Sequence, residues 1–231
     1  MTDIKLKAYR FSEEEMSKMI WLKKLFEKNE YNVSLYPEIY YSTYEEFKRV
    51  FGEIKNNIKE EENTPDYLGV YTYGGGLKKD DSTDEYKIDI ETPTKEGCIV
   101  LFSDRIKSFA NNNSFTEDSV RFVVLMHEVG HWLTHCSRDK TGNFWKYGFQ
   151  LKNKIMKEGL AQLITYWSSN GNHIHEKVME KLTPKDRYGI LDINSPYTAY
   201  LNLLIKSKSE ILAKLSHLRN TFYFKDDIMY D

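Results

Sequence analysis

The sequence contains few cysteines and no apolar run that approaches the length of a membrane span. Crossing a bilayer takes about 20 consecutive apolar residues, and the N-terminal residues also lack the apolar core of a secretory signal. The two cysteines, Cys98 and Cys136, are expected to be reduced and buried rather than joined in a disulfide. Together these absences favour a cytoplasmic protein without a membrane partner.

The sequence also lacks an excess of charge of one sign. Its 33 Lys and Arg residues nearly balance its 35 Asp and Glu residues, which gives a net charge of −2 with neutral histidines. Such a balance provides no general attraction to nucleic acid or to anionic lipid surfaces. We therefore expect neither as a partner. The composition, with 40% hydrophobic and 29% charged residues, is that of an ordinary globular protein.

The strongest chemical pattern lies in one apolar segment, residues 116–136, for which we predict a buried helix. This segment contains His127-Glu128-Val129-Gly130-His131. Residues four apart on a helix lie about 40° apart around its axis, so His127 and His131 present two imidazoles to one point. Glu128 lies about 100° away, beside that point. His135 and Cys136 follow closely, and we interpret them as packing or surface groups rather than ligands.

This spacing predicts a zinc site. Two neutral imidazoles can take two of the four tetrahedral positions around Zn²⁺ and leave room for a carboxylate and a water. Glu128 is then placed to take a proton from that water. The buried setting favours a metal as well, because buried imidazoles and carboxylates need partners. The alternative is a chance occurrence of a pattern that fixes only three residues.

The stretch Val124–Leu133 resembles the extended signature of zincin metallopeptidases. Ser137 stands where the metzincin branch would carry a third histidine, which disfavours that branch. Lys157-Glu158-Gly159-Leu160-Ala161-Gln162 resembles the second motif of the gluzincin, thermolysin-like branch, in which a glutamate on a later helix is the third ligand. The resemblance covers residues 97–167. It implies a zincin-like fold, a Zn²⁺ cofactor and a peptide or protein substrate.

Glu158 is accordingly the third expected zinc ligand. It lies on an apolar segment, residues 153–169, for which we predict a helix, and Gly159 removes a side chain where this helix would approach the metal helix. A solvated charge in the first turn of a helix is the alternative interpretation. Gln162, four residues later on the same face, could orient a ligating histidine. The thermolysin-like pattern has an aspartate at that position.

The resemblance also implies a hydrogen-bond donor for the oxyanion from a segment beyond Glu158. The candidates in this sequence are His173, His175, Tyr188, Tyr197 and Tyr200. We select Tyr197, because it follows Ser195-Pro196 at the start of a long predicted helix, where the positive helix end favours an anion. Simple packing of an aromatic ring at a helix start is the alternative. The two histidines are expected to be exposed in a polar turn.

Around these motifs the residue periodicity predicts an α+β fold. Capping boxes at Ser12 and Thr43 begin two helices, and alternation of apolar residues indicates strands over 67–73, 86–91 and 97–102. Residues 74–84, with three consecutive glycines, are predicted to be a loop, and a short helix is expected over 103–110. By resemblance, one strand within 67–102 is an edge strand beside the metal helix and pairs with an extended substrate.

The sequence contains no internal repeat and no clear linker. We therefore treat residues 1–231 as one zincin-like domain, in which a small mixed sheet and an active-site helix are packed against flanking helices. Its N-terminal helical part spans 1–65, and the sheet, the metal helices and a C-terminal helix span 66–231.

These patterns together favour a zinc-dependent metallopeptidase. His127, His131 and Glu158 would hold the zinc, and Glu128 would move the proton of the attacking water to the leaving amine. One alternative is a zinc-binding protein without turnover, in a binding or scaffold role. The presence of Glu128 counts against it, because a purely structural zinc has no need of a base. The other alternative is a zinc hydrolase that acts on a non-peptide amide or ester.

Overall fold

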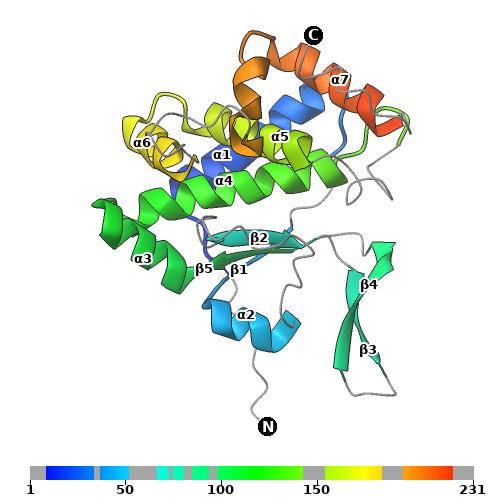
Figure 1. The fold of residues 1–231 in the computed structure, drawn as a ribbon. Helices are drawn as coiled ribbons and strands as arrows, with labels where there is room; N and C mark the ends of the chain where they lie inside the picture. The colour runs from blue at the N-terminus through cyan, green and yellow to red at the C-terminus, as the bar shows by residue number, and fades with distance from the viewer. Residues whose placement is uncertain are drawn as a thin grey trace.

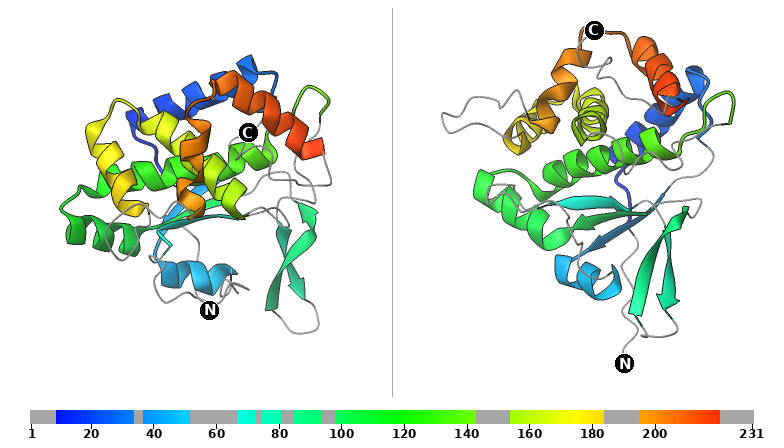
Figure 2. Two further views of the ribbon diagram at one scale, coloured as in Figure 1. Left: turned by 45° about the horizontal axis from the view of Figure 1, so that its top comes forward. Right: turned by 45° about the vertical axis from the view of Figure 1, so that its right-hand side comes forward.

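The computed structural model of the chain describes residues 9–33, 37–51, 67–72, 75–80, 85–93, 98–142, 154–183 and 195–220. Within these ranges the protein has a mixed α+β fold, as the sequence predicted, with α-helices, one 3₁₀-helix and a small mixed sheet. Helix α4 (Glu117–Cys136) crosses the molecule lengthwise (Figure 1). The sheet lies on one side of α4 and most of the other helices lie on the opposite side (Figure 2).

The sheet has three strands in the order β1 (Glu38–Ser42), β5 (Cys98–Phe102) and β2 (Gly69–Thr72). Strand β1 pairs with β5 in parallel, and β2 pairs with β5 in the antiparallel sense. The side chains of β5 alternate between two hydrophobic clusters, because successive residues of a strand point to opposite faces. One cluster lies against α4, and the other contains Phe47 of α2 (Tyr44–Phe51). Thus β5 is covered on both faces, whereas β1 and β2 are the edges of this sheet.

The layer on the far side of α4 contains α1 (Glu13–Lys28), α5 (Lys154–Ser169), α6 (His173–Leu182), a 3₁₀-helix η1 (Pro196–Leu203) and α7 (Lys208–Asn220). The capping box predicted at Ser12 is present, since the Ser12 hydroxyl accepts from the Glu15 backbone and the Glu15 carboxylate accepts from the Ser12 backbone. In the described part of the chain, no helix has the length and apolarity needed to cross a bilayer.

Two strands differ from the sequence-based expectation. The predicted loop is wrong over residues 75–80, which form β3 (Gly75–Asp80) and pair in the antiparallel sense with β4 (Glu85–Pro93). Strand β1 lies in the part expected to be helical and was not predicted. Its pairing partner, β5, is distant in the sequence, so local periodicity gives no signal for it.

Two helices also differ in extent. Helix α3 (Ser103–Asn113) continues beyond the predicted 103–110 and ends at Ser114, which has a left-handed conformation. The long helix predicted from Ser195 is instead divided into η1 and α7. A further capping box, besides those at Ser12 and Thr43, begins α7 and accounts for this division: the Ser207 hydroxyl accepts from the Glu210 backbone, and the Glu210 carboxylate accepts from the Ser207 backbone. The predicted continuation of α2 beyond Phe51 lies outside the described residues.

Candidate metal centre

Helix α4 begins where the sequence predicted, with Thr116 as its N-cap accepting a hydrogen bond from the Ser119 backbone. Most of the helix is buried. His127 and His131 lie one turn apart near the middle of α4, and their side chains are 14% and 13% exposed. The motif is therefore held by a largely buried helix, and the two imidazoles keep a small exposed fraction.

The carboxylate of Glu158, in α5, lies close to both imidazoles. Its Oε2 atom lies 3.2 Å from His127 Nε2 and 3.4 Å from His131 Nε2. In a tetrahedral zinc site with bonds to nitrogen and oxygen of 2.0–2.1 Å, two ligand atoms lie roughly 3.3–3.4 Å apart. The two measured separations match edges of such a tetrahedron. The group His127, His131 and Glu158 can therefore hold a metal ion.

The close approach of α5 to α4 depends on a glycine inside the motif. A Cβ atom added at Gly130 would lie 2.8 Å from Ala161 Cα and 2.9 Å from the Ala161 carbonyl oxygen. A side chain at this position would push the two helices apart. Because Glu158 precedes Ala161 by about one turn, the contact at Gly130 brings the Glu158 carboxylate within reach of the imidazoles.

Gln162 lies one turn after Glu158 and contacts His127, as the sequence predicted. Its Oε1 atom is 3.1 Å from His127 Nδ1. An amide oxygen can only accept a hydrogen bond, so Nδ1 donates and Nε2 is aimed at the point shared with His131. The departure from the thermolysin-like pattern at this position therefore still provides a group that orients the histidine.

Burial and charge act together on the ionisable groups of the centre. Burial raises the pKa of Glu128, and the two histidines only partly offset this effect. Burial also raises the pKa of Glu158, but the charges and hydrogen bonds of His131 and His127 outweigh it and hold that pKa well below its ordinary value. Burial lowers the pKa of His127, but its hydrogen bond to Glu158 and the nearby carboxylates leave it raised. The centre thus combines two carboxylates and two imidazoles, a set that favours a bound cation.

Strand β2 lies beside this centre. Glu128 is 7% exposed, and the backbone N–H of Tyr71 in β2 faces its carboxylate and acts to lower its pKa. Within the described sheet, β2 is an edge strand adjacent to α4. It therefore occupies the position that the sequence analysis expected for one strand of 67–102.

Two tyrosines border the centre. The ring of Tyr197 lies 5.8 Å from the ring of His127, and the preceding Ser195 caps η1. Burial, followed by the charge of Glu158, raises the pKa of Tyr197 well above its ordinary value, so its hydroxyl stays protonated and can donate. Tyr67, just before β2, was not predicted. Burial and the charge of Glu158 also raise its pKa, which places it near the same carboxylate.

The other histidine and tyrosine candidates have different surroundings in the described part of the chain. The predicted turn at His173 and His175 is wrong, because α6 begins at His173 and Asn172 caps it, and the predicted exposure holds for His173 alone. His173 is exposed, but His175 is 4% exposed and its ring is stacked on Phe122. Tyr200 packs near Tyr166, with ring centroids 5.9 Å apart. Tyr188 is outside the described residues.

Neither Cys98 nor Cys136 forms a disulfide, and both are partly buried. Cys98 packs with the cluster on the α2 face of the sheet, whereas Cys136 packs with the cluster that contains the side chains of α4. The two thiols therefore lie in different clusters, and the expectation that they do not form a disulfide is confirmed.

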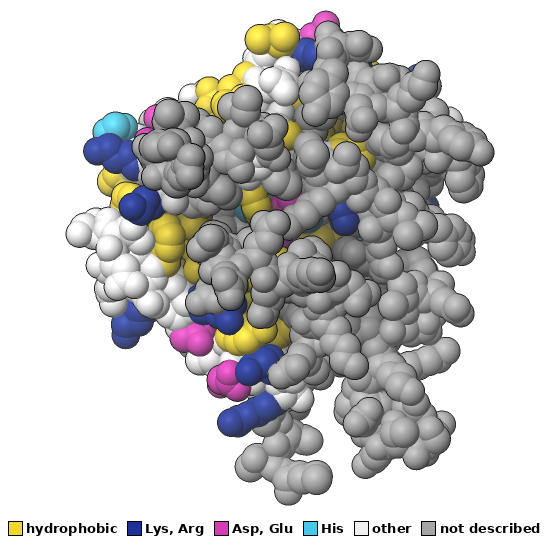
Figure 3. Space-filling model, in the orientation of Figure 1, with side chains coloured by type: hydrophobic (Ala, Val, Ile, Leu, Met, Phe, Trp, Pro, Cys, Tyr) yellow, Lys and Arg dark blue, Asp and Glu magenta, His cyan; other side chains and the backbone are white. Residues whose placement is uncertain are grey.

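On the face of the molecule that Figure 3 shows, hydrophobic side chains are visible among scattered Lys, Arg, Asp and Glu side chains of the described residues. Comparisons with models of protein families, with curated proteins and with solved structures found no match to this chain. The candidate metal centre is therefore characterised by its own geometry.

Proposed function

We propose that the protein is a zinc-dependent metallopeptidase with a zincin-like fold of the gluzincin type. The observation that carries the proposal is the convergence of His127, His131 and Glu158, in which both distances from the Glu158 carboxylate to the imidazoles suit tetrahedral zinc. Glu128 lies next to this point on the same helix, where a catalytic base is needed. A purely structural site would have no use for that carboxylate.

The side chains around the site have distinct roles in this proposal. A zinc ion bound there supplies Lewis-acid activation of water and of the peptide carbonyl. Glu128 accepts a proton from the attacking water and passes it to the leaving amine. The Tyr197 hydroxyl donates to the oxygen on which negative charge develops. The outer edge of β2 in the described sheet pairs with an extended peptide in this proposal, which favours a peptide over a small amide or ester substrate.

The test combines metal analysis with hydrolysis of a peptide library. Native mass spectrometry should find one zinc ion per chain, and a chelator should abolish the cleavage of peptides. Glu128→Gln has nearly the same shape but cannot accept the proton. It should keep the zinc and the melting temperature, and kcat should fall about 10²–10⁴-fold.

Asp118→Asn is the matched control, because Asp118 lies on the same helix, is 82% exposed and is remote from the ligands. Its kcat should equal that of the wild type. Stoichiometric zinc without any cleavage would favour a zinc-binding protein without turnover. A protein that binds no zinc at all would refute the proposal.

A further inference from the structure

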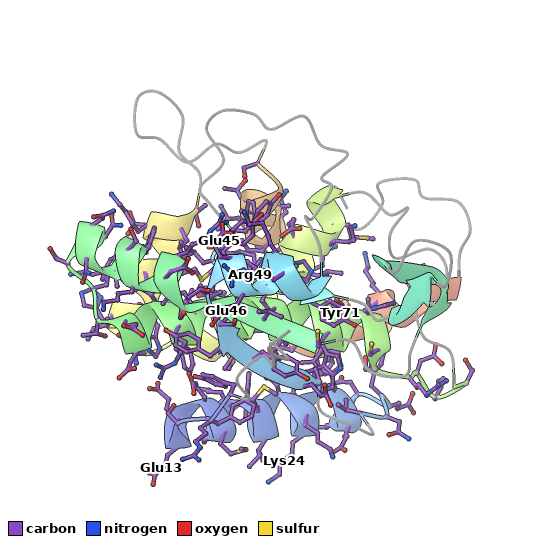
Figure 4. The ribbon with its side chains drawn as sticks, turned by 90° about the horizontal axis from the view of Figure 1, so that it is seen from below. Glu13, Lys24, Glu45, Glu46, Arg49 and Tyr71 are labelled. Atoms are coloured by element: carbon purple, nitrogen blue, oxygen red, sulfur yellow. The ribbon has the colours of Figure 1, made fainter. Side chains whose placement is uncertain are left out.

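Tyr71 connects the edge strand β2 to helix α4 at two separate places. Its hydroxyl lies 2.9 Å from His135 Nδ1 and 3.0 Å from Cys136 Sγ, at the C-terminal end of α4. Its backbone N–H faces the carboxylate of Glu128, about two turns earlier on the same helix, and acts to lower the pKa of that carboxylate. Figure 4 labels Tyr71 beside α4 in a view from the sheet side. One residue thus contacts both the end of α4 and the expected catalytic base.

A further contact fixes how β2 lies along α4. A Cβ atom added at Gly69 would lie 2.8 Å from Val124 Cγ1, so the strand backbone is close to the helix there. From Gly69 to Tyr71 the strand rises about 6.6 Å, and from Val124 to Glu128 the helix rises about 6.0 Å. The two elements therefore run side by side in the same direction with matched rise. A shift of β2 by one residue would remove the Tyr71 N–H from Glu128.

The contacts of the Tyr71 side chain can prevent such a shift. Tyr71 is 6% exposed and His135 is 3% exposed, so their hydrogen bond is shielded from water and sensitive to geometry. Side chains on a helix lean toward its N-terminus, which brings His135 and Cys136 back toward Tyr71. The tyrosine ring also packs edge-on against the His135 ring, with centroids 5.9 Å apart.

From these contacts we infer that Tyr71 is a positioning residue for Glu128. Its hydroxyl, held by His135 and Cys136, fixes the register of β2 on α4, and its backbone N–H holds the Glu128 carboxylate in place beside the metal ligands. This inference rests on the proposed function where it treats Glu128 as the base. The hydrogen bonds that define it do not depend on turnover.

Tyr41 offers a matched control. It lies on β1, the other edge of the sheet, and its hydroxyl donates to Glu117 Oε1 at the N-terminal end of α4, at 2.5 Å. Tyr41 and Tyr71 thus make the same kind of strand-to-helix contact at opposite ends of the helix. Only Tyr71 also contacts Glu128. A role limited to stability would make the two Tyr→Phe variants equivalent.

The first experiment is a double-mutant cycle. Tyr71→Phe should keep its zinc and lower kcat about 10-fold, the low end of the range for groups that orient a metal site. Tyr41→Phe should leave kcat unchanged. In the Glu128→Gln background, Tyr71→Phe should have no further effect on the residual rate, because the group that it positions is already disabled. Equal effects of Tyr71→Phe in both backgrounds would overturn the inference.

The second experiment does not require activity. Amide hydrogen exchange, measured by NMR on the zinc-loaded protein, should show the residue 71 amide exchanging at least about 10-fold faster in both Tyr71→Phe and Glu128→Leu than in the wild type, because leucine cannot accept a hydrogen bond. Tyr41→Phe should not change it. If Tyr71→Phe does not fold, His135→Gln tests the same contact by changing the partner on α4.

The two experiments separate the inference from the proposed function. An unchanged residue 71 amide in Tyr71→Phe would overturn the inference even in an active enzyme. Faster exchange in the variants of a protein that cleaves no peptide would support the placement of Glu128 by Tyr71 and would refute the peptidase.

Discussion

Helix α4 carries two buried polar clusters, and they differ in how their charges are balanced. The cluster nearer its N-terminus contains Arg121, Glu15 and Tyr9. Arg121 Nε lies 2.6 Å from the Tyr9 hydroxyl and 3.3 Å from Glu15 Oε1, and the Tyr9 hydroxyl donates to the same carboxylate. A permanently charged guanidinium here faces one fully buried carboxylate. The cation and the carboxylate of this cluster are therefore both supplied by the protein.

The second cluster, at the middle of α4, has two carboxylates and no permanent cation among its described members. Its positive charge can come only from imidazoles, which are neutral or charged according to their surroundings. A buried carboxylate is costly unless it is paired. The comparison teaches that burial of ionisable groups alone does not indicate function. The informative feature is a set of donors that converge on one point without a permanently charged cation among the described members.

The largest effect on stability is expected from breaking the cluster that contains Arg121. Arg121→Ala leaves Glu15, at 1% exposure, without its cation, so the free energy of unfolding should fall by about 3 kcal/mol. This value is the low end of the range for buried pairs, because Arg121 keeps 17% of its exposure. Urea denaturation measures the loss.

The exposed pair Lys23–Glu27 provides the control for this prediction. Lys23→Ala should change the free energy of unfolding by less than about 1 kcal/mol. Zinc content and kcat of folded Arg121→Ala should match the wild type. A folded variant that has lost its zinc would show that the two clusters are not independent.

The two clusters each contain a tyrosine, and the same substitution should affect them differently. Tyr197→Phe should lower kcat about 10²–10³-fold while zinc content and melting temperature are kept, because it removes only the donor to the oxyanion. Tyr9→Phe should leave kcat unchanged and lower the free energy of unfolding by about 1.5–3 kcal/mol, since it removes hydrogen bonds to charged groups. Steady-state kinetics and urea denaturation of both variants check this contrast. An unchanged kcat in Tyr197→Phe would make its ring a packing group.

Removing a carboxylate from the metal centre should weaken zinc binding more than folding. Glu158→Gln should lower the affinity for zinc by roughly 10–100-fold or more. Its zinc-free form should lose far less stability than Arg121→Ala, because the second carboxylate, Glu128, remains. Competition with a fluorescent chelator measures the affinity. His173→Asn is the control, and an affinity that depends on His173 rather than on Glu158 would contradict the assigned ligand set.

The parts of the fold and of the site that sequence reasoning predicted correctly depend on local patterns. The capping boxes, the start of α4 and the spacing of His127 and His131 are set by residues within one or two turns of each other. Glu158 and Gln162 were found because they share one face of a second apolar helix, and the structure brings that face to His127.

Most of the features that were missed depend on residues distant in the sequence. Strand β1 forms only by pairing with β5. Strand β3 is the exception, because it pairs with β4, which follows it closely, and its glycines and polar residues are typical of a loop. Tyr67 borders the centre only because β2 lies against α4. His175 is buried because α6 packs against Phe122 of α4. None of these contacts leaves a periodic signal in the segment itself.

The smallest predicted effect concerns His175, a buried ionisable group that belongs to neither cluster. Burial lowers its pKa below the ordinary value of 6.5, and Lys18 acts in the same direction, whereas Glu14 and Glu15 oppose it. The folded protein therefore takes up this proton less readily than the unfolded chain. As the pH falls below 6.5, the unfolded chain is protonated first, so the contribution of His175 to stability declines until the lowered pKa of the folded state is reached.

His175→Phe should remove this part of the pH dependence, because a phenyl ring can stack on Phe122 without titrating. The measurement is the free energy of unfolding of zinc-free protein between about pH 5 and pH 8, taken as the difference between variant and wild type, so that the shared contribution of His127 cancels. The stability of the variant relative to the wild type should rise as the pH falls through this window. His173→Asn, at an exposed position in the same helix, should track the wild type. If His175→Phe also tracks the wild type at every pH, burial of His175 does not disfavour its charged form.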